Sequence, residues 1–232
     1  MDLPQKQRII TVAGLEPKQQ KAYDREISQL VRDYRERVGR GEASQDAEAL
    51  VTVGIMRKVG SCYKVARAIS LAQELREQGQ QVVIFTEFLE SAQLLYGYFQ
   101  EKEPTELLTG KIVAQKRQAI VDRFQTGESK VFIGTIKAGG VGLTLAAASN
   151  VILVDRPWTP GDAEQAEDRC HRIGQKQTVS TFWVQLGHID RAIDELIHNK
   201  QKRIELVLKG KRKTLRGVKS PKEVARQLLE VL

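Results

Sequence analysis

From Gln81 onward, short β-prone runs alternate with helical patterns, and this alternation limits the possible fold more than any other feature. The run Gln81–Phe85 (QVVIF) is apolar after its first residue, as expected of a strand buried on both faces of a parallel sheet. Later strands are predicted at Glu106–Leu108, Val131–Gly134, Val151–Val154 and Val179–Leu186, with helices at Ser91–Gln100 and Val113–Phe124. Such alternation indicates βαβ units. The expected fold class is α/β, a parallel sheet with helices on both faces.

The first third of the chain predicts an extended lead-in followed by helices. Leu3–Ala13 is β-prone, and an amphipathic helix is expected from Glu16 to about Gly39. Two more helices are predicted at Ala43–Lys58 and Cys62–Gln78. A final helix is expected from Ile189 to about Leu208, followed by a basic run. Three parts are therefore predicted, at residues 1–78, 79–188 and 189–232.

The segment Gly161–Gln175 (GDAEQAEDRCHRIGQ) has an unusual helical pattern. One face of the predicted helix would carry Gln165, Asp168, Arg169 and Arg172, and the inward face would carry Ala163, Ala166, Cys170 and Ile173. Arginines three positions apart on a helix lie about 5–6 Å apart at Cβ, so both guanidinium groups could bind one phosphate. The alternative is a solvated helix in which Asp168 pairs with Arg172.

A glycine-rich segment, Gly134–Leu145 (GTIKAGGVGLTL), follows a predicted strand. Glycines allow backbone N–H groups to approach a ligand closely. The phosphate-binding pattern G-x-x-x-x-G-K-[ST] is absent here and elsewhere in the sequence. Taken alone, the segment fits a tight turn or a dinucleotide site, and Asp155 would be the acidic ribose-binding residue of the latter.

Two motifs together resemble those of Swi/Snf-type ATP-dependent DNA translocases of helicase superfamily two. The run QAEDRCHRIGQ resembles the last motif of that family, and GTIKAGGVGLTL resembles its fifth, with Thr144 where the family often has Asn. The resemblance covers nearly the whole chain and implies the second, carboxyl-terminal RecA-like lobe. It implies that Arg169 and Arg172 contact ATP, which a first lobe holds with Mg²⁺. The remaining cleft residues that it implies are Gly140, Gly142, Gln165 and Asp168.

The same resemblance implies contacts with the backbone of double-stranded DNA. The residues concerned are Thr86, Lys111, Thr135, Lys137 and Trp158. Thr86 could instead cap the following helix, Lys111 could lie on a solvated face, and Trp158 could form a rigid corner between prolines. The family resemblance also implies that the helix from Ile189 braces the two lobes.

Charge and cysteine content agree with an intracellular protein that binds a polyanion. The formal net charge is +8 and the sequence pI is about 9.5, which favours nucleic acid as a partner. Cys62 and Cys170 have no ligand-like spacing and are expected to be reduced packing residues. No apolar run is long enough to span a bilayer. We expect no membrane partner, and a location in the bacterial nucleoid or the eukaryotic nucleus.

Two features of a complete ATPase are missing from the sequence, namely the phosphate-binding lysine loop and a DExx-type magnesium carboxylate motif. The isolated chain is therefore expected to be inactive, and the first lobe is expected elsewhere on the parent polypeptide or on a separate chain. The alternative is a catalytically silent DNA-binding or regulatory module with the same fold. Its affinity for DNA would not depend on Arg169 or Arg172.

Overall fold

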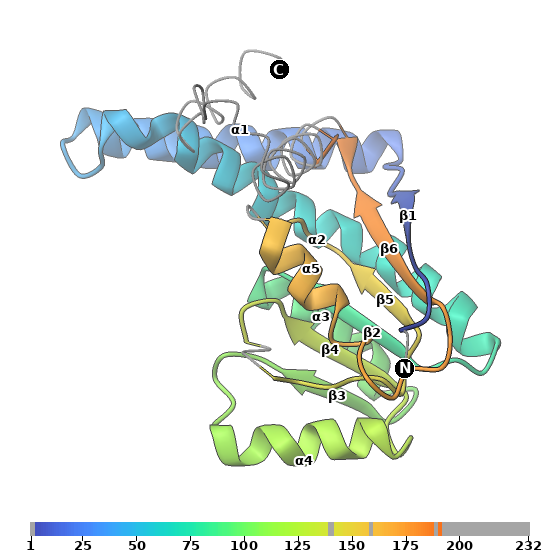
Figure 1. The fold of residues 1–232 in the computed structure, drawn as a ribbon. Helices are drawn as coiled ribbons and strands as arrows, with labels where there is room; N and C mark the ends of the chain where they lie inside the picture. Colours follow the sequence, from blue (N-terminus) through green and yellow to red (C-terminus); the bar gives the residue numbers. More distant parts are fainter. Residues whose placement is uncertain (1–2, 139–141, 158–159, 188–189, 192–232) are drawn as a thin grey trace, which may run out of the picture. The chain divides into compact units, whose positions relative to one another are not determined.

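The computed structural model describes residues 3–138, 142–157, 160–187 and 190–191 (Figure 1). Its contacts divide the chain into two units. The first unit consists of Met1–Ala13 and Lys64–Leu186, and the second of Gly14–Tyr63 and Gly187–Leu232. The predicted part boundaries at residues 78 and 188 stay predictions, and the predicted helix from Ile189 lies outside the described residues except for 190–191.

The first unit is built on a six-stranded sheet in the order β1-β6-β5-β2-β4-β3. The strands are β1 (Lys6–Val12), β2 (Val82–Thr86), β3 (Thr105–Leu108), β4 (Val131–Thr135), β5 (Asn150–Leu153) and β6 (Val179–Gln185). Every neighbouring pair is parallel, which confirms the predicted parallel sheet. The carboxyl ends of the strands therefore share one edge, where ligands bind in open α/β sheets.

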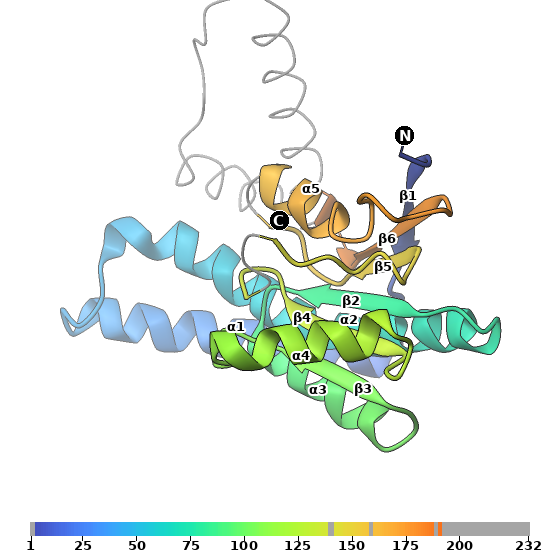
Figure 2. The same ribbon diagram turned by 60° about the horizontal axis from the view of Figure 1, so that its bottom comes forward.

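The two faces of the sheet are covered by different helices, as predicted. Val83, Phe85 and Phe132 share one buried cluster with side chains of α4 (Ala114–Gln125) and α5 (Pro160–Glu167). Alternate residues such as Ile84 face the opposite side. There α3 (Leu89–Gln100) buries Leu95 and Phe99, and in Figure 2 it lies across the strands from α5. All five residues of β2 are buried, which explains why four apolar residues in a row precede Thr86.

The described residues 14–63 of the second unit are mainly helical. They contain α1 (Pro17–Gly39), the 3₁₀ turn η1 (Gln45–Ala47) and the first part of α2 (Glu48–Glu77). The Tyr34 hydroxyl donates to the Ser44 carbonyl oxygen at 2.6 Å and ties the end of α1 to the turn. The predicted break between residues 58 and 62 is wrong, because α2 continues through Gly60. One helical glycine costs about 1 kcal/mol, and the burial of Val59 and Ser61 beside it compensates.

None of the helices in the described part of the chain is long and apolar enough to cross a membrane.

Candidate functional site

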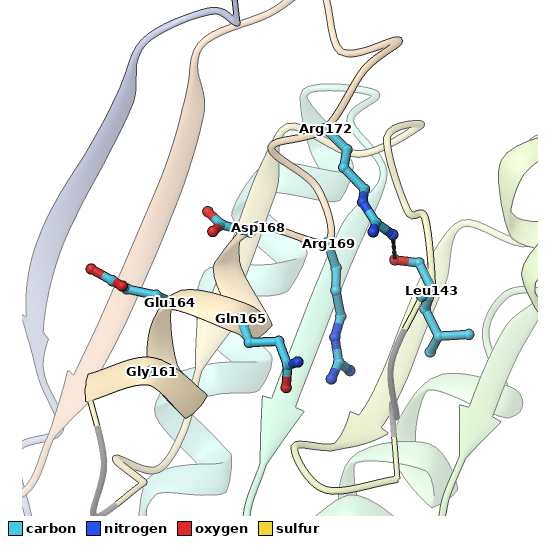
Figure 3. A pocket seen from close by; sticks show the side chains of 8 residues that line it. Leu143, Gly161, Glu164, Gln165, Asp168, Arg169 and Arg172 are labelled. Carbon is cyan, nitrogen blue, oxygen red and sulfur yellow. Dashed lines mark hydrogen bonds between the residues drawn. The ribbon is translucent and has the colours of Figure 1, made fainter.

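A pocket of about 290 Å³ lies beside α5 and the segment that follows it (Figure 3). Its lining is Gly142, Leu143, Gly161, Glu164, Gln165, Asp168, Arg169 and Arg172. Five residues that the sequence assigned to a nucleotide cleft or to catalysis thus come together here. The sixth, Gly140, lies outside the described residues.

The two arginines do not share a helix, which corrects the predicted helical stripe. Helix α5 ends at Glu167, and Asp168–Gln175 forms turns instead. A contact between distant parts of the chain ends the helix, because the Arg169 carbonyl oxygen accepts from the Leu145 amide at 2.8 Å. That oxygen is therefore directed out of the helical ladder. Both guanidinium groups nevertheless line one pocket.

Arg169 is a buried cation with unused hydrogen-bond donors. Its residue is only 4% exposed, and the guanidinium carbon lies 5.0 Å from the centre of the Phe85 ring. Nη2 donates to the Ile136 carbonyl oxygen at 3.3 Å, whereas Nε and Nη1 have no acceptor among the described residues. Burial lowers the pKa of Arg169 to about 10, and the positive charge of Arg172 contributes. A buried charge with idle donors is costly unless an anion completes it.

Arg172 lies on the exposed side of the same pocket. Its Nη1 donates to the Leu143 carbonyl oxygen at 3.1 Å and to the Thr144 hydroxyl at 3.3 Å (Figure 3). The alternative ion pair between Asp168 and Arg172 does not form within the described structure. Asp168 instead accepts from Lys6 at 2.7 Å. The arginine side chains are therefore not neutralised by the acidic residue that sequence spacing suggested.

Glu167 is the site residue that sequence reasoning missed. Its side chain is completely buried, and it accepts two bonds from Arg8 Nε, at 2.8 and 3.1 Å, and one from Arg8 Nη2, at 2.9 Å. The Trp183 indole N–H donates to it at 3.0 Å, and Lys6 Nζ lies 3.3 Å from it. No local pattern distinguishes Glu167 from its acidic neighbours. Its partners come from β1 and β6, far away in sequence.

The inward-facing prediction holds for three of four residues. Ala163, Ala166 and Cys170 are buried, and burial raises the pKa of the Cys170 thiol, as fits an inert packing residue. Ile173 is 87% exposed, so its predicted burial is wrong. The reason is the loss of helical geometry after Glu167. In the turns after Glu167, the side-chain amide Nε2 of Gln175 donates to the carbonyl oxygens of Ala146 and Ala148 and fixes the turn.

Thr86 has a local structural role at the end of β2. It is completely buried, and its hydroxyl donates to Asp155 Oδ2 at 2.5 Å and accepts from the Phe88 amide at 3.2 Å. Asp155 Oδ1 also lies 3.1 Å from Lys64 Nζ. The N-cap position of α3 is Phe88 and has no side-chain cap bond, so the alternative interpretation of Thr86 as the cap of this helix is wrong. A contact with DNA stays a prediction that the burial of the side chain does not favour.

The other residues predicted to contact DNA differ in exposure. Lys111 and Lys137 are exposed, Thr135 is half-buried, and they follow or end the adjacent strands β3 and β4. Arg117 donates to the Ile112 and Ala138 carbonyl oxygens, so it braces the two loops that carry these lysines. Trp158 lies outside the described residues.

Comparison with known proteins agrees with this fold. Residues 64–174 match the helicase conserved C-terminal domain family. YwqA of Bacillus subtilis, named for an ATP-dependent helicase or translocase, is 34% identical over 145 residues, which is 61% of this chain and 16% of YwqA. The chromatin-remodelling factor PICKLE of Arabidopsis thaliana is 35% identical over 158 residues, covering 66% of this chain and 11% of PICKLE. The chain thus spans a small part of the curated relatives that it matches.

Solved structures show the same fold. The C-terminal part of the Fun30 ATPase domain superposes with a TM-score of 0.69 at 20% identity, covering 99% of this chain and 97% of that one. The SWI2/SNF2 ATPase core of Sulfolobus solfataricus in complex with double-stranded DNA gives 0.67 at 23% identity, covering 89% and 47%.

The chain has a RecA-like parallel sheet, and the family match identifies residues 64–174 as a helicase C-terminal domain. The chain belongs to the Swi2/Snf2 type of superfamily two and is its carboxyl-terminal lobe. Its family hydrolyses ATP.

Proposed function

We propose that this lobe supplies Arg169 and Arg172 to ATP held by a first lobe, within an ATP-dependent translocase on double-stranded DNA. The observation that carries the proposal is the buried guanidinium of Arg169, which has two nitrogens, Nε and Nη1, without acceptors among the described residues and lines an open pocket. A phosphate group is the anion whose oxygens fit such a fork.

The chemical role follows from where charge develops during phosphoryl transfer. Negative charge spreads over the equatorial oxygens of the transferred group in the transition state, and fixed cations stabilise it there. Arg169 is held rigidly by Phe85 and the Ile136 carbonyl oxygen, so it needs little reorganisation when the phosphate arrives. Arg172, at the rim, would add a second charge. Gln165, Asp168 and Gly142 would complete the lobe's side of the cleft.

The described residues fit ATP only as one half of a site. They contain no group of three or more His, Cys, Asp or Glu side chains placed to hold a metal ion. The sequence also lacks a phosphate-binding lysine loop. We therefore assign Mg²⁺ and most of the nucleotide contacts to the first lobe, and the arginine contacts to this one.

Mixing the two lobes tests this assignment of the nucleotide contacts. ATP hydrolysis would be measured with and without duplex DNA, for this chain alone and mixed with the first lobe of its parent polypeptide. We expect no turnover by the chain alone and DNA-stimulated turnover by the mixture, because neither half holds a complete site. Hydrolysis by the isolated chain would contradict the proposal.

DNA contact is assigned to the exposed edge that carries Lys111, Thr135 and Lys137. Each lysine that neutralises a phosphate releases a counterion, so Lys111→Ala and Lys137→Ala should each lower the salt slope of DNA binding by about one. Fluorescence anisotropy with duplex DNA at several salt concentrations measures this slope. Lys21→Ala, an exposed lysine of α1, is the control. Unchanged slopes for both lysine variants would remove these residues from the DNA interface.

The same titration addresses the alternative of a catalytically silent DNA-binding module. Such a module would bind DNA equally well without Arg169 and Arg172, and its mixture with a first lobe would not hydrolyse ATP.

A translocase of double-stranded DNA would work where the genome lies, in the nucleoid of a bacterium or the nucleus of a eukaryote.

A further inference from the structure

Strand β1 holds the segment that carries the two arginines. Residues 167–172 contain both arginines, and three members of this segment bond to β1 or to the residues just before it. Glu167 bonds to Arg8, Asp168 to Lys6 and His171 to Pro4. The His171 ring nitrogen donates to the Pro4 carbonyl oxygen at 2.6 Å. Lys6 and Arg8 alternate along β1 and lie on one side of it, and Pro4 comes two residues before the strand. The edge strand β1 and the residues before it therefore contact the start of the segment that carries Arg169 and Arg172.

The bond between Arg8 and Glu167 is the strongest of these contacts. Arg8 approaches the carboxylate through both Nε and Nη2, and paired charge-assisted bonds of this kind fix orientation as well as distance. The Trp183 indole bonds the same carboxylate, and its ring lies 4.9 Å from the Arg8 guanidinium carbon and 4.1 Å from that of Arg156. Glu167 is therefore fixed from β1 and β6 together.

Glu167 is also where helix α5 passes into the arginine segment. Its backbone carbonyl oxygen accepts from the amides of Cys170 at 3.2 Å and His171 at 3.3 Å. Arg169 lies only two residues away, and its own carbonyl oxygen is fixed by Leu145. The backbone on both sides of the Arg169 side chain therefore has one anchor at Glu167 and another at Leu145. The position of the guanidinium depends on both.

We propose that Arg8, acting through Glu167, is a positioning residue for Arg169. This inference rests on the proposed role of Arg169 and assigns that role a support in β1. Misplacing a reacting group by about 1 Å can reduce a rate by about a hundredfold. Loss of the Arg8 contact should therefore lower kcat, while KM for ATP changes little, because most ground-state contacts with ATP belong to the first lobe.

The test uses Arg8→Gln and Glu167→Gln in the reconstituted two-lobe ATPase. We expect each to lower kcat roughly tenfold or more, with KM changed less than about twofold. Arg8→Lys keeps the positive charge but cannot form the paired bonds, so its kcat should lie between that of Arg8→Gln and that of the unmodified protein. The double variant Arg8→Gln with Arg169→Ala should be no slower than Arg169→Ala alone, because positioning matters only when Arg169 is present.

A matched control exists at the opposite edge of the sheet. Arg123 bonds Glu106 through Nε and Nη2, both at 2.7 Å, and Ser129 also donates to Glu106. Arg123→Gln removes the same kind of pair from α4 and β3, so it should lower the melting temperature without changing kcat per folded molecule. Full kcat in Arg8→Gln, or a loss that multiplies with that of Arg169→Ala, would overturn the proposal.

Hydrogen exchange in the chain alone gives a readout without ATP. The amides of Cys170 and His171 should exchange faster in Arg8→Gln and stay protected in Arg123→Gln. Equal protection in both variants would show that Arg8 does not hold the segment. If Arg169→Ala retains full kcat while Arg8→Gln loosens the segment, the proposed function fails and the positioning contact stands as a structural one.

Discussion

Replacing Arg169 with alanine is expected to reduce kcat of the two-lobe ATPase by roughly 10³–10⁵-fold, the range known for arginine fingers. The variant loses a cation that is 4% exposed and whose two idle donors line the pocket. No neighbouring side chain can replace it, since Arg172 is exposed and already donates to Leu143. Steady-state ATP hydrolysis at saturating duplex DNA measures the effect.

Three further variants show whether the loss comes from the pocket. Arg172→Ala should have a smaller effect than Arg169→Ala, because its charge lies in solvent. Arg169→Lys should recover little, since a single ammonium group cannot reproduce the planar fork. Arg37→Ala, an exposed arginine in the last turn of α1, should leave the rate unchanged. Nearly normal turnover in Arg169→Ala would refute the assignment of the arginine finger.

Replacing Phe85 with alanine is expected to lower the free energy of unfolding by about 3–5 kcal/mol, the usual cost of emptying a buried aromatic site. Phe85 is completely buried in β2, and its ring meets Phe132 edge-on at a centroid distance of 6.3 Å. The neighbouring position 134 has no side chain, and a Cβ there would lie 3.0 Å from the Phe85 ring. The ring therefore fills space that no neighbour can take over.

Phe85 also supports the site, because its face lies under the Arg169 guanidinium. Phe99→Ala is the matched control, since Phe99 is equally buried but belongs to α3. Urea denaturation should show similar losses for both variants. Only Phe85→Ala should lower kcat per folded molecule. A loss below about 1 kcal/mol for Phe85→Ala would mean that the core relaxes around the cavity.

The elements of the sheet were predictable because their signal is local. The predicted strand Gln81–Phe85 has four apolar residues in a row after Gln81, and it overlaps β2, which is buried at every position. The gathering of Gln165, Asp168, Arg169 and Arg172 was also predictable from motif resemblance. The details that failed depend on contacts between distant residues. Leu145 ends the predicted helix by bonding the Arg169 carbonyl oxygen, and this partner is 24 positions away.

Glu167 and Thr86 also show that sequence does not reveal which distant residues become hydrogen-bond partners. Glu167 has no sequence feature that marks it, yet partners 159 and 16 positions away make it a fully buried junction. The DNA contact of Thr86 stays a prediction, and its hydroxyl bonds the distant Asp155, a partner that no sequence pattern indicates. A side chain's chemistry can be read from sequence, but its available partners are decided by which strands become neighbours.

Because Arg169 is buried, dehydration of its guanidinium group is separated from the binding of phosphate, whereas a solvent-exposed arginine would undergo both at once. An exposed guanidinium must shed its water each time a phosphate arrives, whereas this one has already shed it when the lobe folds. In the proposed translocase, dehydration of this group would then not recur with every step along the DNA. It would occur once in the lifetime of the folded molecule.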